Sequence, residues 1–113
     1  MANHKLPNYL RTCRKRSGLS QREIAYLLGF DSAHVSRFER FRRTPGFRIA
    51  LAFEAVFNTS IRELFSGDYH KVERLICRRA KLLAKRLAKD APNKHTARKL
   101  AHLKSVIAAA TDR

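Results

Sequence analysis

The stretch LSQREIAYLLGFDSAHVSRFERFRRTP, from Leu19 to Pro45, contains the pattern that decides the fold. Ser20 and Glu23 form an S-x-x-E capping box, in which the serine oxygen accepts a backbone N–H of the first helical turn. Apolar residues then recur at the intervals of one helix face: Ile24, Ala25 and Leu28. Gly29 follows where a helix ends on a residue that tolerates positive φ. We therefore predict a short helix that starts after Ser20.

A second short helix is predicted directly after this turn. Asp31 or Ser32 can cap it, and only Val35 and Phe38 point inward. The face left outside is small or hydrogen-bonding, as a helix needs if it is to enter a DNA groove: Ser32, Ala33, His34, Ser36 and Arg37. Two short helices joined by a turn that contains Gly, the second with a bare polar face, indicate a helix-turn-helix.

The same stretch resembles the lambda-repressor-like (XRE/Cro) helix-turn-helix family, whose pattern reads roughly L-S-Q-x-x-L-A-x-x-x-G-x-s-x-x-x-I-S-x-x-E-x-G-x-x-x-P. The matching residues are Leu19, Ser20, Gln21, Ala25, Gly29, Ser36, Glu39 and Pro45, with Ile24 and Val35 as conservative equivalents. The resemblance extends from about Leu10 to Phe65. Phe41 stands where the family usually has Gly after the second helix, which predicts a longer or differently turned exit.

The resemblance implies which residues read bases. The family's base-contacting positions fall on Ser32, Ala33 and Arg37. Arg37 is the strongest candidate, because a bidentate arginine on guanine is the commonest specific contact. His34 and Ser36 are further candidates for a base or a phosphate.

The resemblance also implies phosphate contacts and one ion pair. Gln21 matches the family's Gln that lies over a phosphate and braces the second helix, although a Gln here is also simply a good helix former. Arginines beside the DNA backbone set register without reading sequence: Arg22, Arg40, Arg42, Arg43 and Arg48. Arg14 and Glu39 take the positions of a family ion pair, and the alternative is that both are separately solvated.

The net charge favours a polyanionic partner. The chain has 113 residues, enough for one domain or one small domain with an appendage, and 25 Lys and Arg against 9 Asp and Glu give +16. Nucleic acid is the leading candidate. No apolar run is long enough to span a membrane, and the N-terminus lacks the layout of a signal peptide. We expect a soluble, cytoplasmic, nucleoid-associated protein.

No metal, cofactor or enzymatic site is indicated. Cys13 and Cys77 form no C-x-x-C motif, and the five histidines lack ligand spacing. Cys13 is expected to be a small buried hydrophobe beside Leu10. No nucleophile has an adjacent base, and there is no Gly-rich phosphate loop. We therefore predict no cofactor and no enzyme activity.

The remaining sequence completes an all-α, five-helix domain over residues 1–66. The first helix is predicted to open at Pro7 or Asn8 and to stop at Gly18. A fourth helix is predicted over residues 47–57, with these core positions: Phe47, Ala50, Leu51, Val56 and Phe57. Ser60 and Glu63 start a short fifth helix. Its apolar residues close the core: Ile61, Leu64 and Phe65.

Residues 67–113 predict a basic, amphipathic helical hairpin. A long helix runs from Tyr69 to about Asp90, and a last helix runs from Lys94 or Thr96 to Ala110. The apolar arc of the long helix contains Val72, Leu75, Ile76, Ala80, Leu82, Leu83 and Leu87. Its opposite side carries Lys71, Arg74, Arg78, Lys81, Lys85 and Lys89. Three interpretations of these cations stay open: a solvated face, a contact with flanking DNA, and a contact with an acidic protein.

These features together predict a sequence-specific, DNA-binding transcriptional regulator. One helix reads few base pairs, so we expect a homodimer on a palindromic operator, joined through the fifth helix and the C-terminal hairpin. A repressor is favoured because no activation or sensor domain is visible. One alternative is an antitoxin-type autoregulator that binds a partner protein through its C-terminal helices. Another is a sequence-tolerant nucleic-acid binder.

Overall fold

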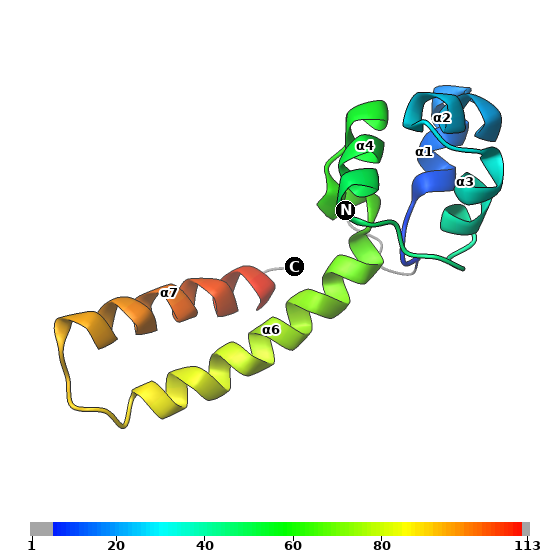
Figure 1. Cartoon of the computed structure of the whole chain (residues 1–113). Coiled ribbons are helices and arrows are strands. Elements are labelled where there is room, and N and C mark those ends of the chain that lie inside the picture. The colour runs from blue at the N-terminus through cyan, green and yellow to red at the C-terminus, as the bar shows by residue number, and fades with distance from the viewer. Residues whose placement is uncertain (1–5, 112–113) are drawn as a thin grey trace. The chain divides into compact units, whose positions relative to one another are not determined.

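The computed structural model describes residues 6–111, and every regular element within that range is a helix, without a strand (Figure 1). The helices are α1 (Leu10–Ser17), α2 (Gln21–Leu28), α3 (Ser32–Glu39), α4 (Phe47–Phe57), α5 (Ile61–Leu64), α6 (Ser66–Leu87) and α7 (Lys94–Thr111). The predicted all-α class is confirmed. The chain forms two compact units, one ending at Tyr69 and the other beginning at His70.

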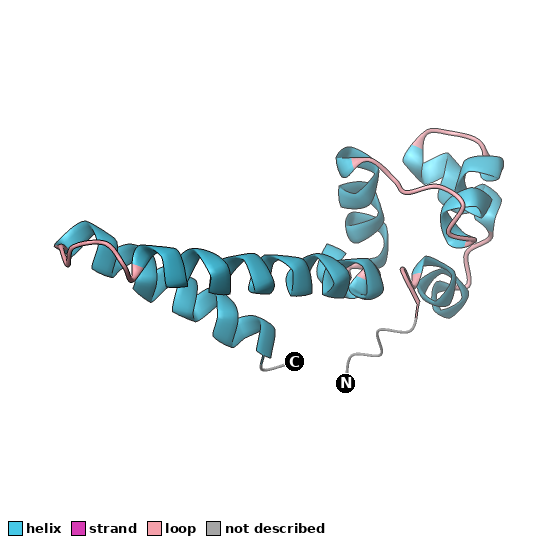
Figure 2. Cartoon of the chain, turned by 90° about the horizontal axis from the view of Figure 1, so that it is seen from below, coloured by secondary structure: helices cyan, strands magenta, loops and turns pink. Residues whose placement is uncertain are grey.

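The first unit packs its short helices around one apolar core. Figure 2 shows the loops that join these helices. Each of α1 to α5 contributes one fully buried side chain: Leu10, Ile24, Val35, Phe53 and Leu64. Helices this short do not persist alone in water, so burial of these side chains supplies most of their stability. Cys13 packs partly buried against the same core, as predicted, and burial raises the pKa of its thiol.

The first helix begins later than the sequence indicated. α1 starts at Leu10, whose N–H donates to Asn8 Oδ1 at 3.1 Å. The Asn8 side chain is buried and donates through Nδ2 to the Phe38 carbonyl at 3.0 Å. The predicted start at Pro7 or Asn8 is wrong because Asn8 ties the entering chain to the end of α3.

The fourth helix has the predicted bounds but buries a different face. Phe47 is 74% exposed and Leu51 is 42% exposed, so their assignment to the core is wrong. Phe53, which was not among the predicted core positions, is buried and meets the Phe38 ring edge-on at 6.0 Å between centroids. The partly buried residues that complete this face are Ile49, Ala50, Val56 and Phe57. Apolar residues surround most of α4, so periodicity does not select its buried face.

The fifth helix passes almost directly into the long one. α6 begins at Ser66 and not at the predicted Tyr69, so Gly67 lies in its first turn. The Asp68 N–H donates to the Pro7 carbonyl at 3.2 Å. Gly67 lies so close to the Leu6 backbone that a Cβ would overlap the Leu6 carbonyl oxygen. The segment before α1 therefore packs against the start of α6.

In the second unit, α7 runs back beside α6 (Figures 1 and 2). α6 ends at Leu87, earlier than the predicted Asp90, and Asn93 starts α7 by accepting the Thr96 N–H at 2.8 Å. Leu87 and Leu103 line one groove of this hairpin. The two helices are therefore antiparallel.

The last helix covers only part of the apolar arc that was predicted on α6. Ala80 is 5% exposed, whereas Val72 and Ile76 are 56% and 46% exposed. The covered side is that of Cys77, Ala80 and Ala84, whose small side chains allow a second helix to approach. An apolar face of α6 consequently remains in solvent. None of the helices described is long and apolar enough to cross a membrane.

Candidate nucleic-acid interface

The two helices and the turn expected from the sequence are α2 and α3. Ser20 Oγ accepts the Glu23 N–H at 3.1 Å, and Glu23 Oε1 accepts the Ser20 N–H at 2.9 Å. The hydrogen bond from the Ser20 backbone N–H is the main cause that lowers the pKa of the Glu23 carboxyl, and the Ser20 side chain contributes further. Gly29 ends α2 with φ 83°, and Asp31 Oδ1 caps α3 by accepting the His34 N–H at 3.3 Å. Local capping thus defines both helices of the motif.

One side of α3 is buried and the other remains accessible. Val35, Phe38 and Glu39 are at most 6% exposed. The exposed or half-buried residues on and directly after α3 are Ser32, Ala33, His34, Ser36, Arg37 and Arg40. The Arg37 side chain has no hydrogen bond or ion pair among residues 6–111. The accessible face therefore combines small side chains with cations that are free to reach a ligand.

Contacts at the turn restrain the imidazole of His34. Its ring stacks on Phe30 with 5.3 Å between centroids, and its Nδ1 lies 3.0 Å from Asp31 Oδ1. The side-chain hydrogen bond with His34 is the main cause that lowers the pKa of the Asp31 carboxyl. Among the residues predicted to read bases, His34 is thus held in place while Arg37 is not.

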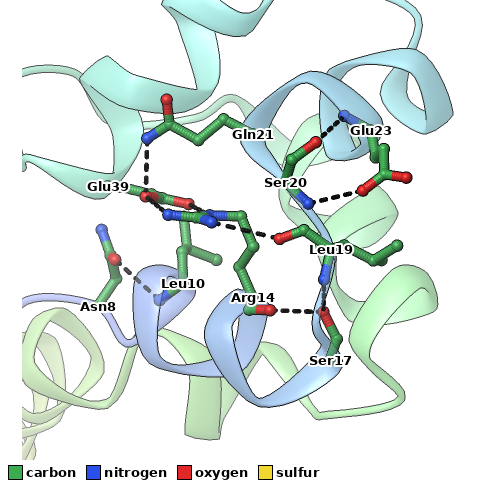
Figure 3. Close-up of polar contacts among 9 residues, drawn as sticks. All are labelled: Asn8, Leu10, Arg14, Ser17, Leu19, Ser20, Gln21, Glu23 and Glu39. Carbon is green, nitrogen blue, oxygen red and sulfur yellow. Dashed lines mark hydrogen bonds and ion pairs between the residues drawn. The ribbon is translucent and has the colours of Figure 1, made fainter.

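Glu39 joins three helices of the first unit (Figure 3). Its carboxylate accepts hydrogen bonds from Arg14 Nε at 2.7 Å, Arg14 Nη2 at 3.2 Å and Gln21 Nε2 at 3.1 Å. Arg14 Nη1 also donates to the Leu19 carbonyl at 3.3 Å. The Arg14 and Glu39 side chains are 14% and 3% exposed, so they are paired and shielded from water.

This network sets the direction in which α3 leaves the core. Arg14 comes from α1 and Gln21 from the first residue of α2, and both bind the last residue of α3. The hydrogen bond to Glu39 raises the pKa of Arg14. Gln21 therefore braces α3, and its amide nitrogen is already engaged on Glu39.

A cleft of about 640 Å³ lies beside the network. It brings Arg11 and Thr12 of α1 together with Arg40 and Arg42, which follow α3. Arg11 and Thr12 had no predicted role, because helical periodicity places a residue on a face but does not tell what that face meets. The other predicted phosphate contacts are exposed outside the cleft lining: Arg22, Arg43 and Arg48.

Comparison with known families gives an independent match. A family model described as a helix-turn-helix domain matches residues 6–64, more than half of the chain. The chain belongs to this helix-turn-helix family. The match agrees with the resemblance to lambda-repressor-like proteins, and it spans α1 to α5. Searches of curated proteins and of solved structures found no match to the chain.

The helix-turn-helix domain keeps a glycine-type exit from α3 although the glycine is replaced. Phe41 adopts φ 64°, in the left-handed region. Its N–H donates to the Phe38 carbonyl at 3.2 Å, and the Arg42 N–H donates to the Arg37 carbonyl at 2.9 Å. These are the two hydrogen bonds of a Schellman motif. The expectation of a longer or differently turned exit is wrong, because the two hydrogen bonds hold Phe41 in the left-handed conformation that a glycine adopts at this position.

Replacing Phe41 by glycine is expected to stabilise the helix-turn-helix domain by about 1 kcal/mol, because it relieves a bulky residue of a left-handed conformation. Asn58 provides a matched control, since it has φ 49° at the end of α4 and asparagine tolerates this region. N58G should therefore gain less than F41G. Urea unfolding followed by circular dichroism measures both, and a lower stability of F41G would show that the Phe41 side chain contributes more by packing than its conformation costs.

Proposed function

We propose that this protein is a sequence-specific regulator of transcription that reads duplex DNA through α3. The observation that carries the proposal is the division of α3 into a buried side and an accessible side that contains small residues and Arg37. The major groove of B-DNA admits one α-helix, and its base edges differ for all four base pairs. A helix that is held rigidly by Glu39 and carries no large apolar side chain outward fits this groove.

The accessible residues of α3 receive different roles in this proposal. The unpaired guanidinium of Arg37 reads guanine in two-point contact. Ser32 and Ser36 donate to or accept from a base edge, and Ala33 contacts a thymine methyl group. His34, restrained by Phe30 and Asp31, contacts DNA only next to the turn.

Phosphate contacts surround this face. Gln21 lies at the first turn of α2, where the Glu39 carboxylate orients its amide and where backbone N–H groups favour an anion. The cleft of about 640 Å³ beside the Glu39 network is lined by Arg11, Arg40 and Arg42. Its concave shape and these cations suit a phosphate of the DNA backbone. Arg22 and Arg43 extend the same positively charged surface. These contacts position the protein without reading sequence.

We further propose a homodimer that acts as a repressor by occupying a palindromic operator. The fifth helix buries Leu64 and packs Ile61 against the core, so it offers little apolar surface to a second copy. The exposed side chains of Val72, Ile76 and Leu83 on α6 are better suited to an interface. The same face also suits a different protein, which keeps the antitoxin-type alternative open to test.

Selection of duplexes from a random pool tests sequence reading and symmetry together. We expect a palindrome with half-sites about one helical turn apart. On the selected duplex, R37A should lose about 1–3 kcal/mol of discrimination at one base position in each half-site. R42A should weaken selected and scrambled duplexes alike.

Two outcomes would contradict this proposal. If no duplex is preferred over scrambled competitor at moderate salt, the chain is a sequence-tolerant binder whose affinity is electrostatic. If the selected site is a single, asymmetric half-site, the protein reads DNA as a monomer. A small protein that co-purifies in equal amount and releases DNA would favour the antitoxin-type regulator.

A further inference from the structure

One face of α6 consists of cations. Lys71, Arg74, Arg78, Lys81 and Lys85, here called the basic stripe, are all exposed. Their alternating intervals of three and four residues align them along one side of a helix. At about 1.5 Å per residue, the basic stripe is about 21 Å long. No proline or glycine interrupts α6 within it, so these charges sit on a stiff rod.

The described part of the second unit holds few acids that could compensate these charges. Residues 70–111 contain 12 Lys and Arg but only two acids, Glu73 and Asp90. Glu73 points to a different side of α6, and Asp90 follows the helix end. No ion pair involves the basic stripe within residues 6–111. Each like-charged pair three or four residues apart destabilises the helix, and a bound polyanion would remove this repulsion.

The surroundings of the basic stripe favour phosphates over an acidic protein. The exposed apolar residues Val72, Ile76 and Leu83 lie on the far side of α6. Of the other exposed large apolar residues of α6, only Leu82 borders the stripe, so the stripe has an apolar residue at one edge but no apolar centre. Protein interfaces have such a centre and are depleted of charge there, whereas contacts to a nucleic-acid backbone are predominantly ionic. Arg74 and Arg78 also line a groove of about 510 Å³ that Ala110 and Thr111 of α7 close on its other side.

We propose that the basic stripe is a second nucleic-acid contact, which binds the sugar–phosphate backbone of duplex DNA outside the base pairs read by α3. This proposal rests on the proposed function, because it takes the same duplex as the ligand. About 21 Å corresponds to about six base-pair steps, so several of the five cations meet phosphates at once. The stripe adds affinity and salt dependence but no sequence information. The apolar face of α6 remains free for a second copy.

The experiment compares the salt dependence of binding for three full-length proteins. The first is the wild type and the second is R74Q/R78Q/K81Q, which neutralises the middle of the basic stripe. The third is R79Q/R86Q/R98Q, which removes the same charge from exposed arginines outside the stripe. Fluorescence anisotropy measures Kd on a short duplex that ends at the selected site and on a long one with about two further helical turns on each side. A scrambled long duplex completes the set.

On the long duplex, the slope of log K against log salt should be less steeply negative in the stripe variant, by about 2.7, which is about 0.9 for each of the three cations that no longer neutralises a phosphate. Its sequence preference and its binding to the short duplex should not change. The control variant should retain the wild-type slope. Circular dichroism should show the same or higher helix stability in the stripe variant, because repulsion is relieved.

Three results would overturn the proposal. Equal effects of both variants would mean that only net charge matters, and an equal effect on the short duplex would place the contact inside the operator. Polyglutamate serves as a probe for acidic proteins. If the stripe variant kept the wild-type slope on DNA but no longer bound polyglutamate, the partner of the stripe would be an acidic protein. The scrambled long duplex separates the two proposals. If sequence reading fails, the wild type binds the selected and the scrambled long duplexes equally well. If the stripe proposal fails, the stripe variant has the wild-type salt slope on both long duplexes.

Discussion

Replacing Arg14 by methionine is expected to lower the free energy of unfolding by about 3 kcal/mol, the lower end of the cost of removing one partner from a buried ion pair, because the Arg14 side chain is only partly buried. Among residues 6–111, Glu39 has two side-chain donors, Arg14 and Gln21, and it is only 6% exposed, so it would keep the Gln21 hydrogen bond alone. Methionine retains the length and the helix propensity of arginine, so the loss reports the missing charge and hydrogen bonds. Urea unfolding of R14M and of the wild type, followed by circular dichroism, measures the difference.

Two variants make this measurement interpretable. K15M changes the next residue of α1, which is exposed, and should alter stability by no more than about 0.5 kcal/mol. R14M/E39M removes both charges and should regain most of the loss, because two apolar side chains need no hydrogen-bond partners. If R14M were as stable as K15M, or if R14M/E39M were no more stable than R14M, the pair would have little part in holding α3.

Replacing Gly67 by alanine is expected to destabilise the first unit by about 3 kcal/mol, near the upper end of the usual cost of overpacking. The new methyl group would overlap the Leu6 carbonyl, and the nearby Pro7 Cα would also be only 2.9 Å away. These are backbone atoms and cannot turn aside as a flexible side chain would. The entering segment would have to move, which also strains the Asp68 N–H to Pro7 hydrogen bond.

Gly46 is the matched control for this substitution. A Cβ at Gly46 meets nothing within 4 Å, and its φ of −68° is open to any residue. G46A should cost less than about 1 kcal/mol, since alanine is only a poorer N-cap than glycine. Thermal unfolding of the two variants side by side provides the comparison. Equal stability of G67A and G46A would mean that the segment before α1 does not pack on α6.

Residues that act on their immediate neighbours were predictable from the sequence. Ser20, Gly29 and Asp31 determine where α2 and α3 begin and end, because capping depends on hydrogen bonds and dihedral angles within a few residues. The pairing of Arg14 with Glu39 was also anticipated, although from the family resemblance and not from any local pattern. No spacing rule joins residues that lie in different helices.

Contacts between distant segments were not predictable in the same way. The buried role of Asn8 depends on the Phe38 carbonyl, and the role of Phe53 depends on which side of α4 meets α2 and α1. The start of α6 at Ser66 was missed because serine, glycine and aspartate together indicate a break. Here the glycine is required by the close approach of the Leu6 backbone.

The amino-acid sequence alone determined the all-helical class, the helix-turn-helix and the excess of positive charge, because helical period, capping and composition are local or additive properties. Only the tertiary structure decided which faces became buried. It engaged Gln21 on Glu39, gathered Arg11 with Arg40 and Arg42 around one cleft, and left the apolar face of α6 in solvent. Burial depends on which surfaces meet in space. When a helix has apolar residues on several sides, its own sequence does not show which side will be buried.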